Sequence, residues 1–469
     1  MTQRQGGSGE VRLLGGEMLN WSDLDGEHGP GPVRGPVARS FLGAARGRTL
    51  IAGPHDPALL DLVPGATVLV RGVPDAELLA GRGDLTVLCG SVAKLGGEAP
   101  FDTIVALAGL ECLGTAEHDE LTWAETFDAL HAVLRPGGRL VLGVANLGGF
   151  HRQIAWPQPL DDGEWTPVPD ETRPVGLRHV RAVAGAATRA YGIYPGLRDA
   201  QVAVDESAGG GVVEAALDRA YQGRGVVLAD PATVAVGFLR QGLGVEAAPA
   251  WVVVASDDEA GLPEVTVGAG PGPAGPTLES VLVRAAGRRD LPRVRELLGQ
   301  WCHGGAAGVP AGQVIVAASG ELVPLVPAGA RGAAVADLAA RFFRGGFPHP
   351  WPGVRSAAEL ATMLESMTGG SDADGEATRP APGGEAEGVP ADRAVAVVEL
   401  IAERDRLIGE LAEARAQAAF FEEELNAREA EVRQVRRTVE LLSGSGPARA
   451  GQAFVGGVRA ARRVLRRRT

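Results

Sequence analysis

The sequence predicts an α/β protein with a Rossmann-like sheet and helices on both faces, followed by a small α+β domain and a C-terminal coiled coil. Two observations predict this order. From residue 48 to residue 150, short apolar runs alternate with helical segments, and such alternation builds a parallel sheet that is covered on both sides. Near the C-terminus, a heptad pattern follows a stretch rich in Gly, Pro and acidic residues.

The first elements follow one another at short intervals. Apolar runs predict strands at 49–52, 67–70, 85–88, 103–107 and 139–144. Helical patterns lie between them at 58–62, 75–80 and 121–134. The last helix has the clearest limits, because Thr122 and Glu125 form a capping box and Pro136, Gly137 and Gly138 end the helical pattern.

The remaining segments predict a second and a third part of the chain. Residues 187–195 and 248–256 are typical of two further strands of the same sheet. Between residues 260 and 366 we expect helices at 291–301 and 334–343 and a hairpin at 313–326. The predicted limits are a flexible N-terminal segment at 1–45 with a short helix near 18–24, a sheet domain at 46–258, a small domain at 259–367, a disordered linker at 368–392, a coiled coil at 393–443 and a basic amphipathic tail at 452–469.

Composition excludes several function classes. The net charge of −13 argues against general nucleic-acid binding, which depends on basic side chains. The only lysine, Lys94, does not stand in a phosphate-binding loop. The three cysteines form no CxxC pair, so we expect neither a disulfide framework nor a metal site. The N-terminus lacks an apolar signal core, and we therefore expect a cytoplasmic protein.

Two segments carry a resemblance to a known family. "FDTIVALAGLECL" (101–113) is similar to the fourth strand and following loop of the class I S-adenosylmethionine (SAM) methyltransferases, and "LRPGGRLVLGVAN" (134–146) to their helix, turn and fifth strand. In the broad type 11 and type 12 sense, the resemblance runs from about residue 48 to residue 152. It implies that residues 187–195 and 248–256 are the closing antiparallel strands of the family sheet, and that SAM is the methyl donor.

The resemblance also implies where SAM is held, since ligands of open α/β sheets lie at the carboxyl ends of the strands. The methionine part would contact residues 53–56, including Gly53, His55 and Asp56. The ribose would lie at Arg71, and the adenine between Gly90 and Ser91. The donor methyl would lie beside residues 108–110, which include Ala108 and Leu110.

The sequence departs from the family at these positions. The family's E/D-x-G-x-G-x-G loop is here "AGPHDP", which keeps only Gly53, so the resemblance includes a degenerate cofactor loop. Arg71 replaces the acid that accepts the ribose hydroxyls, and an arginine cannot accept a hydrogen bond. Ser91 replaces a common aspartate. A shifted alignment would let Asp75 supply the missing acid.

Catalytic residues are harder to predict, because methyl transfer needs a base only to deprotonate the acceptor. The candidates near the relevant loops are Glu111, His118 and His151, each of which could equally be a surface or capping residue. Tyr191 and Tyr194 could line an acceptor pocket, although aromatic residues in an apolar strand are more often core.

The coiled coil and the tail suggest partners. Leu411, Leu425 and Val432 fall on a positions of the heptad and Phe421 and Val435 on d positions, so we expect homo-oligomerisation through 393–443. A long helix docked on a domain is the alternative. Six arginines around an apolar stripe in 454–469 favour peripheral contact with the inner membrane face, with an acidic polymer or an inert tail as alternatives.

Two functions remain open from the sequence. One is a SAM-dependent methyltransferase that acts on an unidentified acceptor, such as a glycan or another small hydroxylated molecule. The other is a catalytically inactive methyltransferase-like scaffold or interaction protein, oligomerised by its coiled coil. The degenerate loop favours the second, whereas the 101–146 region favours the first only at the level of fold.

Overall fold

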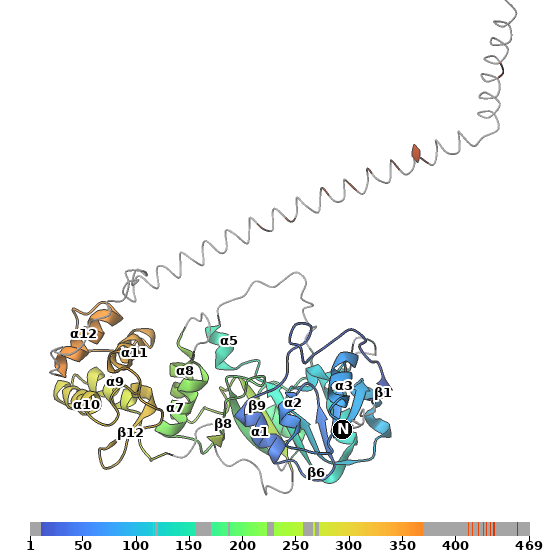
Figure 1. Cartoon of the computed structure of the whole chain (residues 1–469), viewed down its shortest axis with the longest axis horizontal. Coiled ribbons are helices and arrows are strands. Elements are labelled where there is room, and N and C mark those ends of the chain that lie inside the picture. The colour runs from blue at the N-terminus through green and yellow to red at the C-terminus, as the bar shows by residue number, and fades with distance from the viewer. Residues whose placement is uncertain are drawn as a thin grey trace, which may run out of the picture. The chain divides into compact units, whose positions relative to one another are not determined.

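The computed structural model describes residues 11–115, 117, 121–155, 170–185, 188–222, 229–256, 266–267 and 272–368, together with a few single helical positions between 411 and 457. The chain divides into two compact units, Met1–Ala381 and Pro382–Thr469. The candidate site lies in the first unit (Figure 1).

Ten described strands form one sheet in the order β1-β4-β3-β2-β5-β6-β9-β7-β8-β10. Their bounds are β1 (Val11–Gly15), β2 (Thr49–Ala52), β3 (Thr67–Val70), β4 (Thr86–Gly90), β5 (Phe101–Ala106), β6 (Leu134–Ala145), β7 (Thr188–Tyr194), β8 (Val202–Val204), β9 (Ala250–Ala255) and β10 (Thr266–Val267). The strands from β1 to β6 pair in parallel. The α/β class and the mostly parallel sheet are confirmed.

The two strands expected at 187–195 and 248–256 close the sheet as β7 and β9. β9 lies between β6 and β7 and is antiparallel to both. The insertion between them contributes β8 and two helices, α7 (Gly211–Ala220) and α8 (Pro231–Arg240). The antiparallel closure expected from the resemblance is therefore present.

Helices cover both faces of this sheet, and the alternation of side chains along each strand explains why. In β2, Leu50 and Ala52 enter one hydrophobic cluster and Ile51 enters the other. The Ile51 face is covered by α1 (Pro36–Gly43), α2 (Pro57–Leu60) and α3 (Val73–Ala80). The opposite face is covered by α7 and α8 together with η1 (Val92–Gly97), η2 (Leu110–Cys112), α4 (Trp123–Ala132), α5 (Phe150–Ile154) and α6 (Leu177–Ala184).

The helix limits predicted for α4 are close to those observed. Thr122 accepts a hydrogen bond from the Glu125 amide, and the Glu125 carboxylate accepts one from the Thr122 amide at 2.8 Å, which is the expected capping box. The helix ends at Ala132, and β6 begins at Leu134 and runs through the Pro-Gly-Gly turn into its buried half.

The segment from 278 to 368 has a hydrophobic core of its own, built around the buried Trp301. Its elements are α9 (Leu278–Gly287), α10 (Leu291–His303), η3 (Ala311–Gln313), β11 (Val314–Val316), β12 (Leu322–Pro324), α11 (Arg331–Arg344) and α12 (Ala357–Met367). The two helices and the antiparallel hairpin expected here are present. In Figure 1 this segment lies next to α7 and α8.

The N-terminal segment differs from its prediction. β1 extends the sheet beside β4, and the helix expected near 18–24 is wrong: Met18 forms a bridge with Gly72, and turns follow it. The physical reason is that the backbone of this segment bonds to the sheet loops, with the Met18 amide donating to the Arg71 carbonyl at 2.9 Å. A helix would have used these groups internally.

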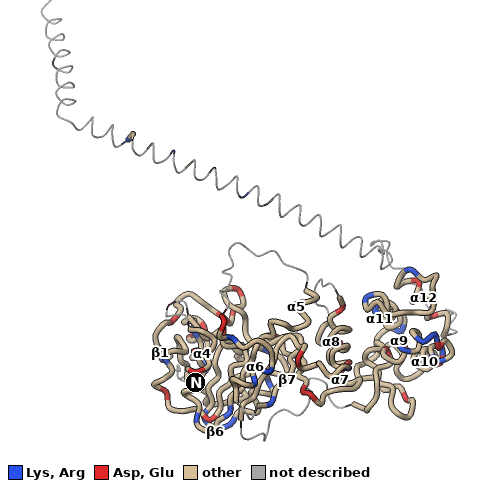
Figure 2. Tube along the Cα trace, turned by 180° about the vertical axis from the view of Figure 1, so that it is seen from behind, with Lys and Arg blue, Asp and Glu red and all other residues tan. Residues whose placement is uncertain are grey.

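The linker, most of the expected coiled coil and most of the basic tail lie outside the described residues. Single described positions Leu411, Phe421, Leu425, Val432 and Val435 are helical and exposed. Across the described part of the chain, the helices are too short or too polar to cross a bilayer. Figure 2 shows charges of both signs interspersed over the sheet part.

Candidate functional site

The strand order reverses at β2, which has β3 on one side and β5 on the other. Loops that leave β2 and β5 therefore turn to opposite faces, and open α/β sheets bind ligands at such a reversal, beside the carboxyl ends of the strands. Gly53 follows β2 with φ +89, and a Cβ on it would lie 3.4 Å from the Ala108 Cβ after β5. The structure thus brings together two of the predicted positions, Gly53 and Ala108.

His55, in the loop that follows β2, lies inside the protein. Its side chain is buried, and Nδ1 lies 3.0 Å from the carbonyl oxygen of Gly53. Burial lowers the pKa of His55 from 6.5 to about 4, so the ring is neutral at pH 7. Asp56, the next predicted cofactor residue, caps α2 by accepting a hydrogen bond from the Ala58 amide at 2.9 Å. Asp56 is thus used as a helix cap, and the buried Nε2 of His55 has no hydrogen-bond partner among the described residues.

An N-terminal strip of chain covers this loop. The Val33 amide donates to the Pro54 carbonyl at 3.0 Å, and the Asp56 amide donates to the Val33 carbonyl at 3.0 Å. Val33 itself is buried. We call residues 15–34 the covering segment, because further contacts of the same kind continue along the ends of β3 and β4.

Arg71, at the end of β3, is held by this covering segment. Its Nε donates to Oδ2 of Asp23 at 2.7 Å and its Nη2 to Oδ1 at 2.8 Å, which is a bidentate ion pair. Nη1 donates to the Gly114 carbonyl at 2.9 Å, and the guanidinium lies 5.4 Å from the Trp21 ring centroid. Burial alone would lower the pKa of Arg71, but hydrogen bonds and charge from Asp23 raise it above its usual value. Arg71 therefore binds Asp23 where the resemblance implied a ribose.

Asp75, the alternative acid for the ribose, is also engaged. Its carboxylate accepts hydrogen bonds from the Ser22 hydroxyl at 2.5 Å and from the Asp23 amide at 2.7 Å. Burial raises the pKa of Asp75, and these hydrogen bonds partly oppose that rise. The backbones also approach closely, since a Cβ on Gly72 would lie 2.0 Å from the Trp21 carbonyl oxygen.

Gly90 and Ser91 are covered in the same way. The Ser91 amide donates to the Gly15 carbonyl at 3.0 Å, and a Cβ on Gly90 would lie 2.6 Å from that same oxygen. The Ser91 hydroxyl caps η1 by accepting from the Ala93 amide at 3.3 Å. Leu110 is a core residue of the sheet and not a pocket residue. The predicted adenine position is thus in contact with the chain's own Gly15.

The candidate bases are dispersed. Glu111 is exposed and pairs with Arg173 at 2.9 Å, which fits a surface role. His118 lies outside the described residues. His151, on α5, is half-buried, and burial together with Arg152 lowers its pKa. Its Nδ1 has no hydrogen-bond partner among the described residues. His151 is the one described candidate that keeps an unpaired ring nitrogen next to the end of β6.

The aromatic candidates are core residues. Tyr191 and Tyr194 are fully buried in the two hydrophobic clusters of the sheet. The Tyr194 hydroxyl donates to the Gly244 carbonyl, and burial raises its pKa. Their positions therefore support packing and not acceptor binding.

Sequence reasoning missed the part played by Trp21, Ser22 and Asp23. Their segment is rich in Gly and Pro, which predicted flexibility, whereas its side chains bond to positions about fifty residues away. The available signal was complementary charge: the "WSDLD" stretch carries two acids that could pair with an arginine such as Arg71, although Asp56 and Asp61 lie nearer to it in the sequence.

Comparisons with known proteins give distant matches. No family model matches the chain, and no curated protein matches it. Among solved structures, it is similar to one titled for the conversion of a disulfide bond into a thioacetal group during echinomycin biosynthesis, with 15% identity over 48% of this chain and 81% of that chain and a TM-score of 0.27.

Two further solved structures are named methyltransferases. The CcbJ methyltransferase from Streptomyces caelestis is 18% identical over 29% of this chain and 59% of that chain, with a TM-score of 0.20. A SAM-dependent methyltransferase from Bacteroides fragilis in complex with S-adenosyl-L-homocysteine is 22% identical over 24% of this chain and 47% of that chain, with a TM-score of 0.18. The chain thus spans less than two thirds of either one. The structural neighbours include SAM-dependent methyltransferases, and the likeness is distant and partial.

Proposed function

We propose that this chain is a methyltransferase-like scaffold whose cofactor edge is closed by its own covering segment, and that it acts by holding partners and not by transferring methyl groups. One observation carries the proposal. The Arg71 guanidinium and the Asp23 carboxylate satisfy each other in a bidentate pair, with side chains only 14% and 3% exposed. A ribose at this place would have to break that pair.

The other positions support the same conclusion. Asp75 already accepts hydrogen bonds from the covering segment. The Ser91 hydroxyl is used to cap η1, and the Ser91 amide donates to Gly15. The neutral, buried His55 offers no charge to the carboxylate of a bound SAM. The residues present therefore do not fit SAM in this arrangement of the chain, and we derive no catalytic step through it.

The second candidate is a SAM-dependent methyltransferase that acts on a glycan or another small hydroxylated acceptor. It is favoured by the reversal of strand order at β2 and by Gly53, whose left-handed backbone lies against Ala108 as a close cofactor approach would need. His151 would then be the base. This function requires the covering segment to move away from Arg71.

Calorimetric titration of SAM into the full chain tests both candidates. The wild-type chain should give no binding heat at millimolar SAM. A Gly72→Ala variant displaces the covering segment, because its Cβ would collide with the Trp21 carbonyl, whereas Gly72 has an ordinary extended backbone that alanine adopts. Gly81→Ala is the matched control, since its Cβ would meet no atom closer than 3.4 Å.

The outcomes separate the candidates. If neither Gly72→Ala nor the wild type binds SAM, the scaffold is supported. If only Gly72→Ala binds, the chain has a SAM site that the covering segment closes, which favours the methyltransferase candidate. Micromolar binding to the wild type would overturn the closed edge altogether.

A scaffold of this kind would associate with further copies of itself, and we propose that residues 393–443 form the contact between the copies. The described positions Leu425 and Val432 are helical and 62% and 50% exposed, on the a positions of the expected seam. Leu425→Lys should lower the oligomer mass measured by analytical ultracentrifugation, because a charge at an a position is desolvated on association. Arg433→Ala, on the outward b position of the heptad, should leave the mass unchanged. A monomeric wild type would contradict this assignment.

A further inference from the structure

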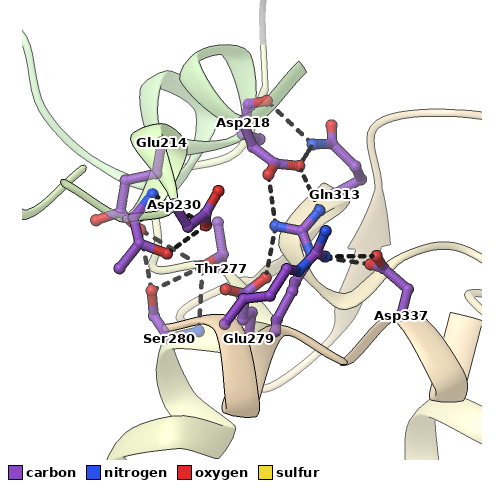
Figure 3. A network of polar contacts seen from close by, with 12 residues as sticks. Glu214, Asp218, Asp230, Thr277, Glu279, Ser280, Gln313 and Asp337 are labelled. Carbon is purple, nitrogen blue, oxygen red and sulfur yellow. Dashed lines mark hydrogen bonds and ion pairs between the residues drawn. The ribbon is translucent and has the colours of Figure 1, made fainter. Parts of the chain in front are cut away.

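A polar cavity lies where α7 and α8 meet α9 and α11. Its volume is about 180 Å³, somewhat more than the roughly 150 Å³ of an engineered cavity that binds benzene. Figure 3 shows the polar network around it. The polar side chains that line it are Glu214, Asp218, Thr233, Arg240, Thr277, Glu279, Ser280 and Arg341. Apolar atoms of Ala232, Val236, Val283 and Phe347 complete the wall.

The first carboxylate of the network, Glu214 on α7, is fully bonded. Arg240 donates to both of its oxygens at 2.8 Å, and the Ser280 hydroxyl lies 3.0 Å from Oε2. Burial would raise the pKa of Glu214, but Arg240 and the hydroxyl groups lower it below its usual value. Glu214 is therefore a charged group with little capacity left for a ligand.

The second carboxylate, Asp218, is bonded in the same way from the other side. Arg341 on α11 donates to both oxygens, with Nη2 at 3.0 Å from Oδ2, and Gln313 Nε2 donates to Oδ2 at 2.8 Å. Arg341 also donates through Nε to Asp337 at 2.9 Å. Both arginines of the cavity are thus each held by a carboxylate of α7.

Glu279, in the first turn of α9, is the third carboxyl that lines the cavity. Its side chain is 16% exposed and its Oε2 is completely buried. Oε2 lies 3.2 Å from Nη1 of Arg341, within ion-pair range, yet no hydrogen bond from the described residues satisfies it. A Cβ on Gly312 would lie 2.8 Å from this oxygen, so the backbone packs closely against this side of the carboxyl.

The surroundings of Glu279 are negative on balance. Burial raises its pKa from 4.5 to about 7, opposed by Arg341 and reinforced by Asp218, Asp337 and Asp230. Glu279 also contributes to raising the pKa of Arg240, the other arginine of the cavity. The charged side chains that line the cavity are three carboxylates, Glu214, Asp218 and Glu279, and two arginines, Arg240 and Arg341. Because Glu214 and Asp218 each hold one arginine, an ionised Glu279 has no counter-charge of its own.

We propose that this cavity binds a small aliphatic amine, whose ammonium group donates to the Glu279 carboxylate and whose alkyl part lies on the apolar wall. An ammonium supplies a positive charge and up to three donors. A neutral hydroxyl supplies a donor but leaves the charge uncompensated. A metal ion fits less well, because the described residues contain no group of three or more His, Cys, Asp or Glu side chains arranged to hold one.

Titration of butylamine into the full chain, followed by calorimetry, tests the proposal. We expect a dissociation constant on the order of 1 mM for so small a probe. Butan-1-ol, which has the same shape without the charge, should bind at least about tenfold more weakly, the factor that 1.4 kcal/mol represents. Glu279→Gln should abolish butylamine binding, and Glu296→Gln, an exposed glutamate of α10, should leave it unchanged.

The pH dependence gives a second readout that needs no variant. The ammonium stays protonated up to about pH 10, so only the carboxyl titrates between pH 6 and 8. Because Glu279 has a pKa of about 7, butylamine should bind about tenfold more tightly at pH 8 than at pH 6. This pH dependence tests the role of Glu279 in the wild-type chain, even if Glu279→Gln does not fold.

Three outcomes would overturn the proposal. Equal binding of butan-1-ol and butylamine would show a polar cavity without preference for a cation. Butylamine binding that Glu279→Gln retains would place the amine elsewhere. No binding at tens of millimolar would leave ordered water as the occupant of the cavity.

Discussion

Two buried polar regions of this chain differ in how their charges are satisfied. At the carboxyl ends of β2, β3 and β4, Arg71 and Asp75 are bonded by the covering segment, so the chain supplies its own partners. At the α7–α9 cavity, Glu214 and Asp218 are bonded by arginines, but Glu279 keeps an unbonded buried oxygen. The first region resembles a ligand site that is closed, and the second has the unmet requirement of an open one.

The part of this chain that resembles a cofactor site is therefore not the part whose buried groups need a ligand. Buried polar groups are nearly always hydrogen-bonded. A charged group that is satisfied within the chain, such as Arg71, gains little from a ligand, whereas an unsatisfied carboxyl gains a hydrogen bond and a counter-charge. The comparison predicts opposite responses to mutation in the two regions.

The largest effect is expected at Asp23. Asp23→Ala leaves Arg71 buried without its carboxylate and should lower the free energy of unfolding by about 3 kcal/mol. Urea unfolding of the full chain measures it. Asp25→Ala removes an exposed acid of the same segment that pairs with His28, and should cost much less than Asp23→Ala, because exposed ion pairs contribute little to stability. Equal losses in the two variants would mean that the covering segment is not anchored by Asp23.

A change of opposite sign is expected at Glu279. Its pKa is raised in the folded state, to about 7 from 4.5. The folded protein therefore binds this proton more tightly than the unfolded chain, and wild-type stability falls as pH rises from about 4.5 through 7. Glu279→Gln removes that loss and should gain about 2 kcal/mol over wild type between pH 5 and pH 8.

The measurement at Glu279 must be a difference between the two proteins. His55 has a lowered pKa, of about 4, so its contribution to stability is lost as pH falls from 6.5 through 4, and its slope opposes that of Glu279. Subtracting the wild-type curve from the Glu279→Gln curve cancels His55. Parallel curves would contradict the account of the cavity.

A smaller, local effect is expected at Gly72. In Gly72→Ala the collision with the Trp21 carbonyl should loosen the covering segment, and trypsin should cleave after Arg34 about tenfold faster, which corresponds to about 1.4 kcal/mol. Mass spectrometry of timed digests identifies the site. Gly81→Ala should be cleaved at the wild-type rate, and unchanged cleavage in Gly72→Ala would show that the close approach is not a restraint.

The smallest effect is expected at Ser22. Ser22→Ala removes one hydrogen bond to Asp75, while the Asp23 amide keeps a second, so the loss should be about 1 kcal/mol. Thermal unfolding detects it. Ser319→Ala, at an exposed turn, is the control and should change stability by less than about 0.5 kcal/mol. A loss equal to that of Asp23→Ala would move the main anchor from Arg71 to Asp75.

Much of the sheet could be predicted because its signals are local. β2 and β3 are uninterrupted runs of buried residues bounded by Gly and Pro, and α4 carries its own capping box. β7 and β9 were found from their apolar runs although they pair with residues far along the chain. These elements are specified by periodicity and turn chemistry, which a single sequence displays.

The two polar regions could not be predicted for the opposite reason. Asp23 lies in a stretch without periodicity, and its bond to Arg71 joins residues 48 positions apart. Glu279 has the sequence appearance of an ordinary first-turn acid of a helix. Glu279 is enclosed by residues of α7 and α11, which lie far from it in the sequence. No local pattern in the sequence predicts how these helices pack.

Amide hydrogen exchange followed by mass spectrometry shows whether the covering segment closes the cofactor edge. The amides of Met18, Asp23 and Val33, which are bonded to the sheet loops and to Asp75, should exchange slowly, and millimolar SAM should leave their rates unchanged. Rapid exchange at these amides, or protection that appears only with SAM, would contradict the account.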